Sequence, residues 1–95
     1  MSKLWSVQGD PNSHGAGNLI AQNPQTVRIN GIPVIEHDSP AYPDGLCPAP
    51  PHCNPYTING SSTVFVYGKP VHRERDDRIC GAKTIVRGQS TVRAG

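Results

Sequence analysis

Short runs in which β-branched and polar residues alternate recur along the chain, and each run is followed by glycine and then by proline. Residues 26–30 and 63–67 are two such runs, and Gly31 and Gly68 follow them. Alternation of this kind is typical of strands, and the glycine after it is typical of a tight hairpin turn. Gly or Pro interrupts almost every ten residues, so that no segment keeps a helical period. The pattern predicts a mostly β chain with much loop, in which residues 32–35 and 69–72 form the second strands of the hairpins.

The first hairpin sequence is repeated. Thr26–Val34 returns as Thr63–Val71, and a third copy begins at Thr91, five residues from the end of the sequence. This third copy lacks its second strand. The N-terminal segment Lys3–Val7 can supply it, because it stands before Asp10 much as the second copy stands before Asp76.

We therefore expect three pseudo-threefold repeats in one domain of residues 1–95, with the last repeat divided between the two ends of the chain. A chain of 95 residues has room for one small domain only. In such an arrangement Trp5 lies near Val92 and the two termini are neighbours.

A possible metal ligand occupies a nearly constant place in each repeat: His14, His52 and Cys80. A tetrahedral site needs a fourth ligand. The inserted residues 36–51 contain five prolines and offer Cys47. Cys53 is the competing residue, but in an extended segment its side chain points away from that of the adjacent His52. The set His14, Cys47, His52 and Cys80 suits Zn²⁺, with Fe²⁺ as the alternative, and its four protein ligands indicate a structural ion.

The composition also favours a metal. The chain is 35% hydrophobic, with ten glycines and ten prolines, so its core is weak and needs a further stabilising element. Three cysteines with histidines nearby favour metal binding over a disulfide framework. We find no secretory leader or membrane-spanning stretch in the sequence, which indicates synthesis in a reducing cytoplasm. A net charge of +2 is too small to indicate nucleic-acid binding.

The remaining polar residues are expected to have structural roles. Asp10, Asp76 and Asp77 precede the ligand turns and are expected to cap them by accepting backbone N–H groups. His37 and His72 have no matching positions in the other repeats and are interpreted as surface residues. The charged run 69–78 is interpreted as a solvated turn. No nucleophile or phosphate-binding motif is recognisable in the sequence, so we do not expect an enzyme.

Taken together, these residues resemble the PAAR-repeat family. The matching motifs are Gly9-Asp10, Ser13-His14-Gly15, Thr26–Pro33, Cys47-Pro48 with His52, Thr63–Pro70 and Cys80-Gly81-Ala82. The name-giving Pro-Ala-Ala-Arg is replaced by residues 33–36 and 70–73. The resemblance implies a small conical domain with zinc near its apex. It also implies that the domain caps the trimeric β-helical spike of a contractile phage tail or a type VI secretion system.

The resemblance sets the functional expectation. A single domain without an effector extension is similar to the spike tip of a contractile phage, of T-even type, at the tail baseplate of the virion. Such a tip sharpens the spike for membrane puncture, with one copy per spike trimer and transient contact with the host membrane. Alternatives are a secretion tip that carries effectors and a small zinc enzyme. The candidate contact residues for the spike are Leu4, Trp5, Ile29, Ile32, Phe65, Tyr67 and Val92.

Overall fold

The computed structural model describes residues 2–23, 27–50 and 52–95, and within these ranges the regular structure consists of very short strands. The strands are β1 (Lys3–Leu4), β2 (Arg28–Ile29), β3 (Ile32–Pro33), β4 (Phe65–Val66), β5 (Lys69–Pro70) and β6 (Arg93–Ala94). They form three separate antiparallel pairs, β1 with β6, β2 with β3, and β4 with β5. No helix occurs in the described ranges, and accordingly none that could cross a bilayer. The prediction of a mostly β chain with much loop is confirmed.

The two local hairpins have the turn chemistry that the sequence predicted. Asn30 and Gly31 join β2 to β3 with φ values of 52° and 80°, and Tyr67 and Gly68 join β4 to β5 with 54° and 76°. Two consecutive positive φ values are the mark of a type I′ turn, in which glycine is readily accommodated. The strands are shorter than predicted because the chain leaves its hairpin partner after Pro33 and Pro70, where Val34 forms a bridge to Val7 and Val71 forms one to Glu36. Thr26, at the predicted start of the first strand, lies outside the described residues.

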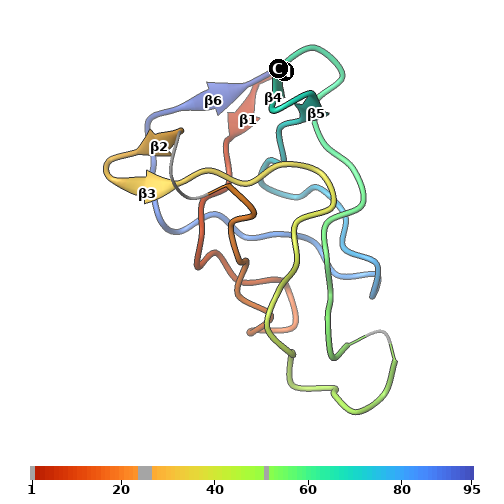
Figure 1. Ribbon diagram of the computed structural model, residues 1–95. Coiled ribbons are helices and arrows are strands. Elements are labelled where there is room, and N and C mark those ends of the chain that lie inside the picture. The colour runs from red at the N-terminus through yellow and green to blue at the C-terminus, as the bar shows by residue number, and fades with distance from the viewer. Residues whose placement is uncertain (1, 24–26, 51) are drawn as a thin grey trace.

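The third pair joins the two ends of the chain. Lys3 lies opposite Ala94 and Leu4 opposite Arg93. The N–H of Trp5 continues the contact by donating to the carbonyl oxygen of Val92 at 3.0 Å. Trp5 and Val92 are therefore neighbours, as the sequence predicted, and β1 and β6 bring the termini to the same place (Figure 1).

Isolated bridges connect the segments that follow the three pairs into closed cycles. The first cycle links Val7 with Val34, Glu36 with Val71, and Arg73 with Trp5. A second cycle links Asn12 with Thr84, Leu19 with Ala41, and Thr57 with Arg78. Each cycle returns to the segment where it began. The three segments that follow the strand pairs are therefore bridged to one another in a ring.

The strand pairs gather at one end of the molecule, and the loop of residues 42–56, in green, extends from the other (Figure 1). We call these the hairpin end and the apex. The apolar core lies in two small clusters between them. Val7, Ile29 and Val34 form one cluster beneath Trp5, and the other is formed by Leu19, Ala21, Ile35 and Ala41.

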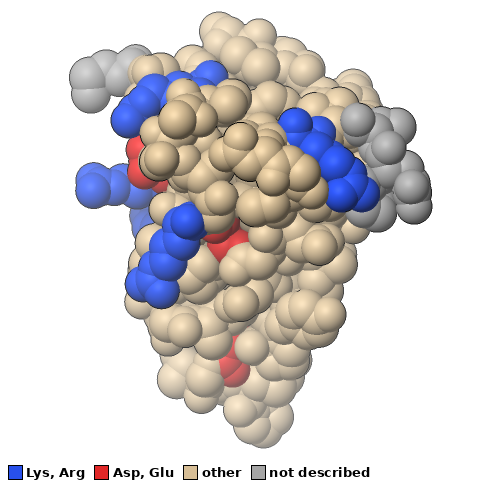
Figure 2. Space-filling view, turned by 90° about the vertical axis from the view of Figure 1, so that its left-hand side faces the viewer, with Lys and Arg blue, Asp and Glu red and all other residues tan. Residues whose placement is uncertain are grey.

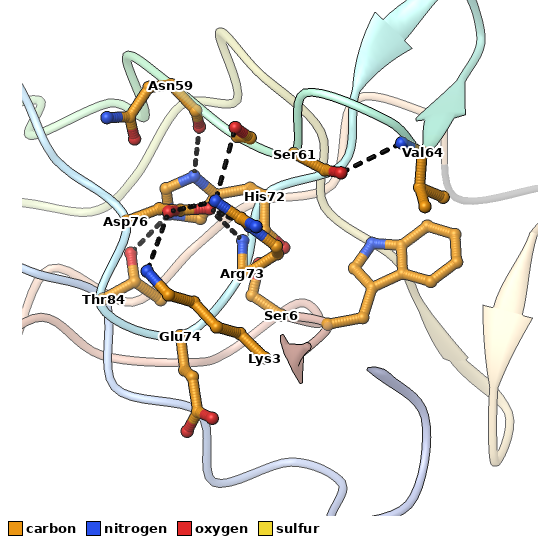
Figure 3. A network of polar contacts seen from close by, with 12 residues as sticks. Lys3, Ser6, Asn59, Ser61, Val64, His72, Arg73, Glu74, Asp76 and Thr84 are labelled. Atoms are coloured by element: carbon orange, nitrogen blue, oxygen red, sulfur yellow. Dashed lines mark hydrogen bonds and ion pairs between the residues drawn. The ribbon is translucent and has the colours of Figure 1, made fainter. Parts of the chain in front are cut away.

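His72 is fully buried, which corrects the expectation of a surface histidine. Its Nδ1 lies 2.8 Å from the carbonyl oxygen of Asn59, and its Nε2 lies 2.6 Å from Oγ1 of Thr84 (Figure 3). The carbonyl requires Nδ1–H as the donor, so the Thr84 hydroxyl donates to Nε2. Both ring nitrogens are thereby satisfied with the ring neutral. Burial lowers the pKa of His72 to about 4.

Arg78 is also buried, with 1% of its surface exposed, although its charged sequence context indicated a solvated turn. Its Nε donates to Oγ1 of Thr84 at 2.7 Å. The other guanidinium nitrogens donate to the carbonyl oxygens of Gly17, Pro55 and Asp10. Burial lowers the pKa of Arg78 to about 10, so it remains cationic at neutral pH. The prediction of a solvated turn is wrong for Arg78, because its side chain points inward and donates to carbonyl oxygens of separate segments.

The aspartates before the ligand turns have two different roles. Asp10 accepts from the N–H groups of Val7, Arg87 and Gly88, and Asp76 accepts from the N–H of Arg73. None of these donors lies in a ligand turn, so the expectation that Asp10 and Asp76 cap those turns is wrong, although both accept backbone N–H groups of other segments. Asp77 accepts from the side chains of Asn59 and Lys83 instead.

Candidate metal centre

Two turns of the same form present His14 and Cys80. The backbone N–H of Asn12 donates to Ala16 O at 2.7 Å in one turn, and the backbone N–H of Arg78 donates to Ala82 O at 2.9 Å in the other. Each turn has a glycine directly after the candidate ligand, with φ of 89° at Gly15 and 87° at Gly81. Glycine adopts these positive φ values without steric cost. The imidazole and the thiol therefore occupy matching places on two copies of one local structure.

The loop at the apex contributes the other side of the cluster. The N–H of Asp44 donates to the carbonyl oxygen of His52 at 2.9 Å, which holds the two residues together. The N–H of Leu46 donates to Oδ1 of Asp44 at 2.9 Å and fixes the direction of the carboxylate. A disulfide between Cys47 and Cys53 closes the loop between these elements.

Four candidate donors converge at this place: His14, Asp44, His52 and Cys80, whose ligand atoms all lie within 4.8 Å of one another. Oδ2 of Asp44 lies 3.1 Å from Nδ1 of His14 and 3.0 Å from Nδ1 of His52. The two imidazole rings have their centroids 5.2 Å apart. Asp44 is buried, whereas the histidine side chains remain 30% and 14% exposed. The cluster therefore lies just under the surface of the apex.

The structure brings together three of the four residues that the sequence singled out, namely His14, His52 and Cys80. Cys47 does not join them, because its sulfur is bonded to that of Cys53. The expectation that metal binding replaces a disulfide is corrected in the same way, since the structure has both a disulfide and a donor cluster, with Cys80 as the free thiol.

Asp44 is absent from the ligand set expected from the sequence, because that set contains only cysteine and histidine. A signal for it exists in the repeat. His14 follows Asp10 by four residues, and Cys80 follows Asp76 by four. In the remaining repeat Ser39 occupies the place of those aspartates, and Asp44 follows it by five.

The carboxylate of Asp44 is held in its charged form. Burial by itself would raise the pKa of Asp44. The hydrogen bonds from the Leu46 N–H and from the side chains of His52, His14 and Asn12 outweigh this effect and hold the pKa well below its usual value. The cluster therefore presents a buried anion between two imidazoles at neutral pH, which is an environment that favours a cation.

The donor set fits a tetrahedral divalent ion. In a tetrahedron with bonds of about 2.0 Å, neighbouring N and O ligands are about 3.3 Å apart. The separations of 3.0 and 3.1 Å between Asp44 Oδ2 and the histidine nitrogens are close to that value. Two imidazoles, a carboxylate and a thiol are ligands that Zn²⁺ and Fe²⁺ both accept. The four residues would hold such an ion by protein atoms alone.

Comparison with known proteins agrees with this architecture. The family model of the PAAR motif matches residues 8–86, which is most of the chain. The chain belongs to the PAAR motif family. A search of the curated proteins found no match. PAAR proteins are structural components at the tips of contractile injection machines, and membership is consistent with a spike-tip protein of such a system.

The seven contact residues expected from the sequence differ in accessibility. Phe65 is 57% exposed, Val92 37% and Tyr67 36%. Leu4, Trp5 and Ile32 are half-buried, and the indole Nε1 of Trp5 donates to Ile35 O at 3.0 Å. Ile29 is buried in the cluster with Val7 and Val34, so it is a core residue and leaves the set of contact candidates.

Proposed function

We propose that this PAAR protein is a structural tip that caps the trimeric β-helical spike of a contractile injection machine, with one copy per trimer. The observation that carries this proposal is the closed cycle of bridges at the hairpin end, which joins Val7 to Val34, Glu36 to Val71 and Arg73 to Trp5. Such a cycle gives one chain three similar sides, as a partner with threefold symmetry requires.

Backbone geometry outside the bridges supports a pseudo-threefold arrangement of three repeats. Positive φ occurs at Gly9, Asp38 and Arg75, which hold matching places after the three strand pairs. The N–H groups of these residues donate, in the same order, to the carbonyl oxygens of Leu19, Thr57 and Thr84. Each of the last three is followed by an isoleucine in the sequence, so these positions match in sequence as well.

The hairpin end has the properties of a capping surface. The carbonyl oxygens of Leu4, Pro33 and Pro70 accept from other segments of the chain, so the outer edges of β2, β4 and β6 are the ones that can pair with strands of a partner. Exposed Phe65, Tyr67 and Val92 lie on or next to these strands and add apolar area. A trimer whose three chains end together would have both its strand edges and its apolar residues covered.

The apex would be stabilised by a structural Zn²⁺ bound by His14, Asp44, His52 and Cys80, with Fe²⁺ as the alternative. Structural zinc contributes on the order of 10 kcal/mol in small metal-binding peptides. That exceeds the typical net stability of a small domain. Four protein ligands leave no coordination position for a substrate, which supports a structural role over a zinc enzyme.

The narrowing of the molecule from the hairpin end to the apex supports a conical shape suited to membrane puncture (Figure 2). Force applied through the spike would be concentrated on the small area of the apex, in transient contact with the host membrane. We place the protein at the baseplate of a contractile phage virion, of T-even type, with a type VI secretion tip as the alternative. This last step rests on the sequence expectation, and proteomics of purified virions tests it.

The capping proposal is tested by stoichiometry. The protein is mixed with a trimeric β-helical spike fragment, and the mass of the complex is measured by light scattering after size exclusion. We expect one chain per trimer, and Phe65→Asn is expected to weaken the complex. Three chains per trimer would contradict the proposal, because each spike chain would then bind its own copy.

A further inference from the structure

The surface of the apex is apolar and carries almost no charge. Tyr42 is 62% exposed and Leu46 51% exposed, and the described residues from Pro48 to Pro50 are exposed as well. Asp44 is the only Asp, Glu, Lys or Arg in the sequence from 42 to 56, and it is 5% exposed. In Figure 2 the Lys and Arg residues lie toward the wide end, and the narrow end is almost entirely uncharged.

Apolar residues continue beyond the loop on the adjacent segments. Ile58 and Ile79 are each 38% exposed. The N–H of Ile79 donates to the carbonyl oxygen of Tyr56 at 2.9 Å, which places its segment against the end of the loop. Exposed apolar surface at one end of a small protein indicates a contact with a partner or a membrane.

Most backbone N–H groups in the first part of the apex loop have acceptors within the protein. Positions 43, 48 and 50 are proline and have no N–H. The N–H groups of the other residues from 42 to 50, Gly45 excepted, have intramolecular acceptors. The N–H of Tyr42 donates to Asn18 O, and that of Asp44 donates to His52 O. Within the loop, the N–H groups of Leu46 and Cys47 donate to Oδ1 and O of Asp44, and that of Ala49 donates to Leu46 O. Hydrocarbon offers no partner for a backbone donor, so a segment that enters a bilayer must satisfy its donors internally.

The loop is stiff as well as apolar. The disulfide Cys47–Cys53 closes it, and proline restricts the chain on both sides of Ala49. A stiff loop loses little conformational entropy when it is transferred into another medium. Its apolar side chains are therefore already arranged for contact with lipid.

We propose that the apex, through Leu46 and Tyr42, enters the interfacial layer of a lipid bilayer and gives the protein an affinity for membranes that needs no applied force. This inference rests on the proposed function and names the surface that meets the membrane. The affinity arises from burial of apolar side chains, to a depth of roughly 5–10 Å as for other interfacial segments. It therefore extends to zwitterionic lipid and persists at high salt.

The first test is flotation of the full chain with phosphatidylcholine vesicles at 0.15 M and 1 M salt. We expect binding at both salt concentrations, and a decrease of about tenfold in the partition coefficient for Leu46→Asn. Phe65→Asn is the matched control, because Phe65 is similarly exposed but lies at the hairpin end. Trp5 fluorescence and thermal melts check that both variants are folded.

Three results would overturn the inference. One is the absence of binding to zwitterionic vesicles. Another is binding to anionic vesicles alone that is lost at 1 M salt, because basic side chains would then carry it. The third is an equal decrease for Leu46→Asn and Phe65→Asn, which would indicate general stickiness.

Orientation is tested with vesicles of brominated lipid, which quench tryptophan that reaches the acyl chains. Trp5 is the single tryptophan and lies at the hairpin end, so its emission is expected to stay unchanged on binding. Leu46→Trp adds a second tryptophan at the apex, and its share of the emission is expected to be quenched. Quenching of Trp5 in the parent protein would overturn the inference, because the opposite end would then meet the lipid.

The spike-capping assay separates this inference from the proposed function. Leu46→Asn is expected to bind the trimer as the parent does, whereas Phe65→Asn is expected to bind vesicles as the parent does. If vesicle binding depends on Leu46 but the protein does not bind the trimer, the lipid contact is supported and the capping proposal is contradicted. Capping without binding to vesicles removes the lipid contact alone.

Discussion

The backbone N–H of Trp5 donates to the carbonyl oxygen of Val92 at 3.0 Å, across almost the whole length of the sequence. The same pair of segments forms β1 and β6. The side chain of Gln89 reinforces the contact, since its Nε2 donates to both Trp5 O and Val92 O. The end of the chain is therefore part of the structure that carries the N-terminal strand.

Deletion of residues 91–95 is expected to destabilise the protein. It removes β6, the acceptor for Trp5 and the buried Ala94. At about 1 kcal/mol net per hydrogen bond, the loss is roughly 3 kcal/mol, measured by urea denaturation. Arg93→Ala, an exposed change within the same strand, is expected to cost less than about 0.5 kcal/mol. Equal stability of the truncated and parent chains would show that this strand pair does not contribute to the fold.

The identity of the fourth metal donor is open to a direct comparison. Asp44→Asn is expected to lower zinc affinity by at least tenfold, because it removes the anion between His14 and His52. The double variant Cys47→Ala, Cys53→Ala is expected to keep one zinc per chain. Competition with a chromogenic chelator gives the affinity, and elemental analysis gives the stoichiometry. If the cysteine variant loses zinc and Asp44→Asn keeps it, the fourth ligand would be Cys47, as expected from the sequence.

His72 makes stability depend on pH. Its folded pKa is about 4, below the unfolded value of 6.5, so the unfolded chain binds more protons between these values. The contribution is complete above pH 6.5 and is lost as the pH falls toward 4. Between pH 7 and pH 5 the free energy of unfolding is expected to drop by roughly 2 kcal/mol from this group. In His72→Gln, urea denaturation should show a smaller decrease in the free energy of unfolding between pH 7 and pH 5. If the decrease equals that of the parent, groups other than His72 cause it.

Arg78→Lys is expected to be strongly destabilising although it keeps the charge. Lysine cannot reproduce the divergent bonds to Gly17 O, Pro55 O and Asp10 O, and unsatisfied buried groups cost roughly 1–3 kcal/mol each. A decrease in the unfolding free energy of roughly 3 kcal/mol or more is expected by thermal or urea melts. Arg87→Lys, at an exposed position, serves as the control and is expected to change little. Similar behaviour of the two variants would contradict this role for Arg78.

The hairpins were predictable because their signals are local. Two positive φ values at Asn30 and Gly31, and again at Tyr67 and Gly68, follow from turn chemistry that neighbouring residues determine. The pairing of the chain ends was also predictable, although it is not local, because the truncated third copy of the repeat required a partner strand. The strands are shorter than expected because each second strand leaves its hairpin partner to form a bridge with another segment, which no local signal shows.

The candidate centre was predictable where the repeat supplied its residues, as for His14 and Cys80. Cys47 was misplaced because the choice between a metal and Cys53 depends on distances within a folded loop. The burial of His72 and Arg78 could not be inferred from their neighbours. Both sequence contexts are those of a surface turn, and only the fold supplies the acceptors that make their burial favourable.

Pairing of β1 with β6 has a consequence for any polypeptide joined to this domain. Lys3 and Ala94 lie opposite each other at the hairpin end, remote from the loop of residues 42–56 (Figure 1). If the domain caps a spike as proposed, a fused enzyme, toxin or affinity tag would lie on the side of the spike and follow the apex. An extension at either terminus would leave the surface of the apex uncovered, so cargo could be attached to the domain without changing the end that the proposal places in front.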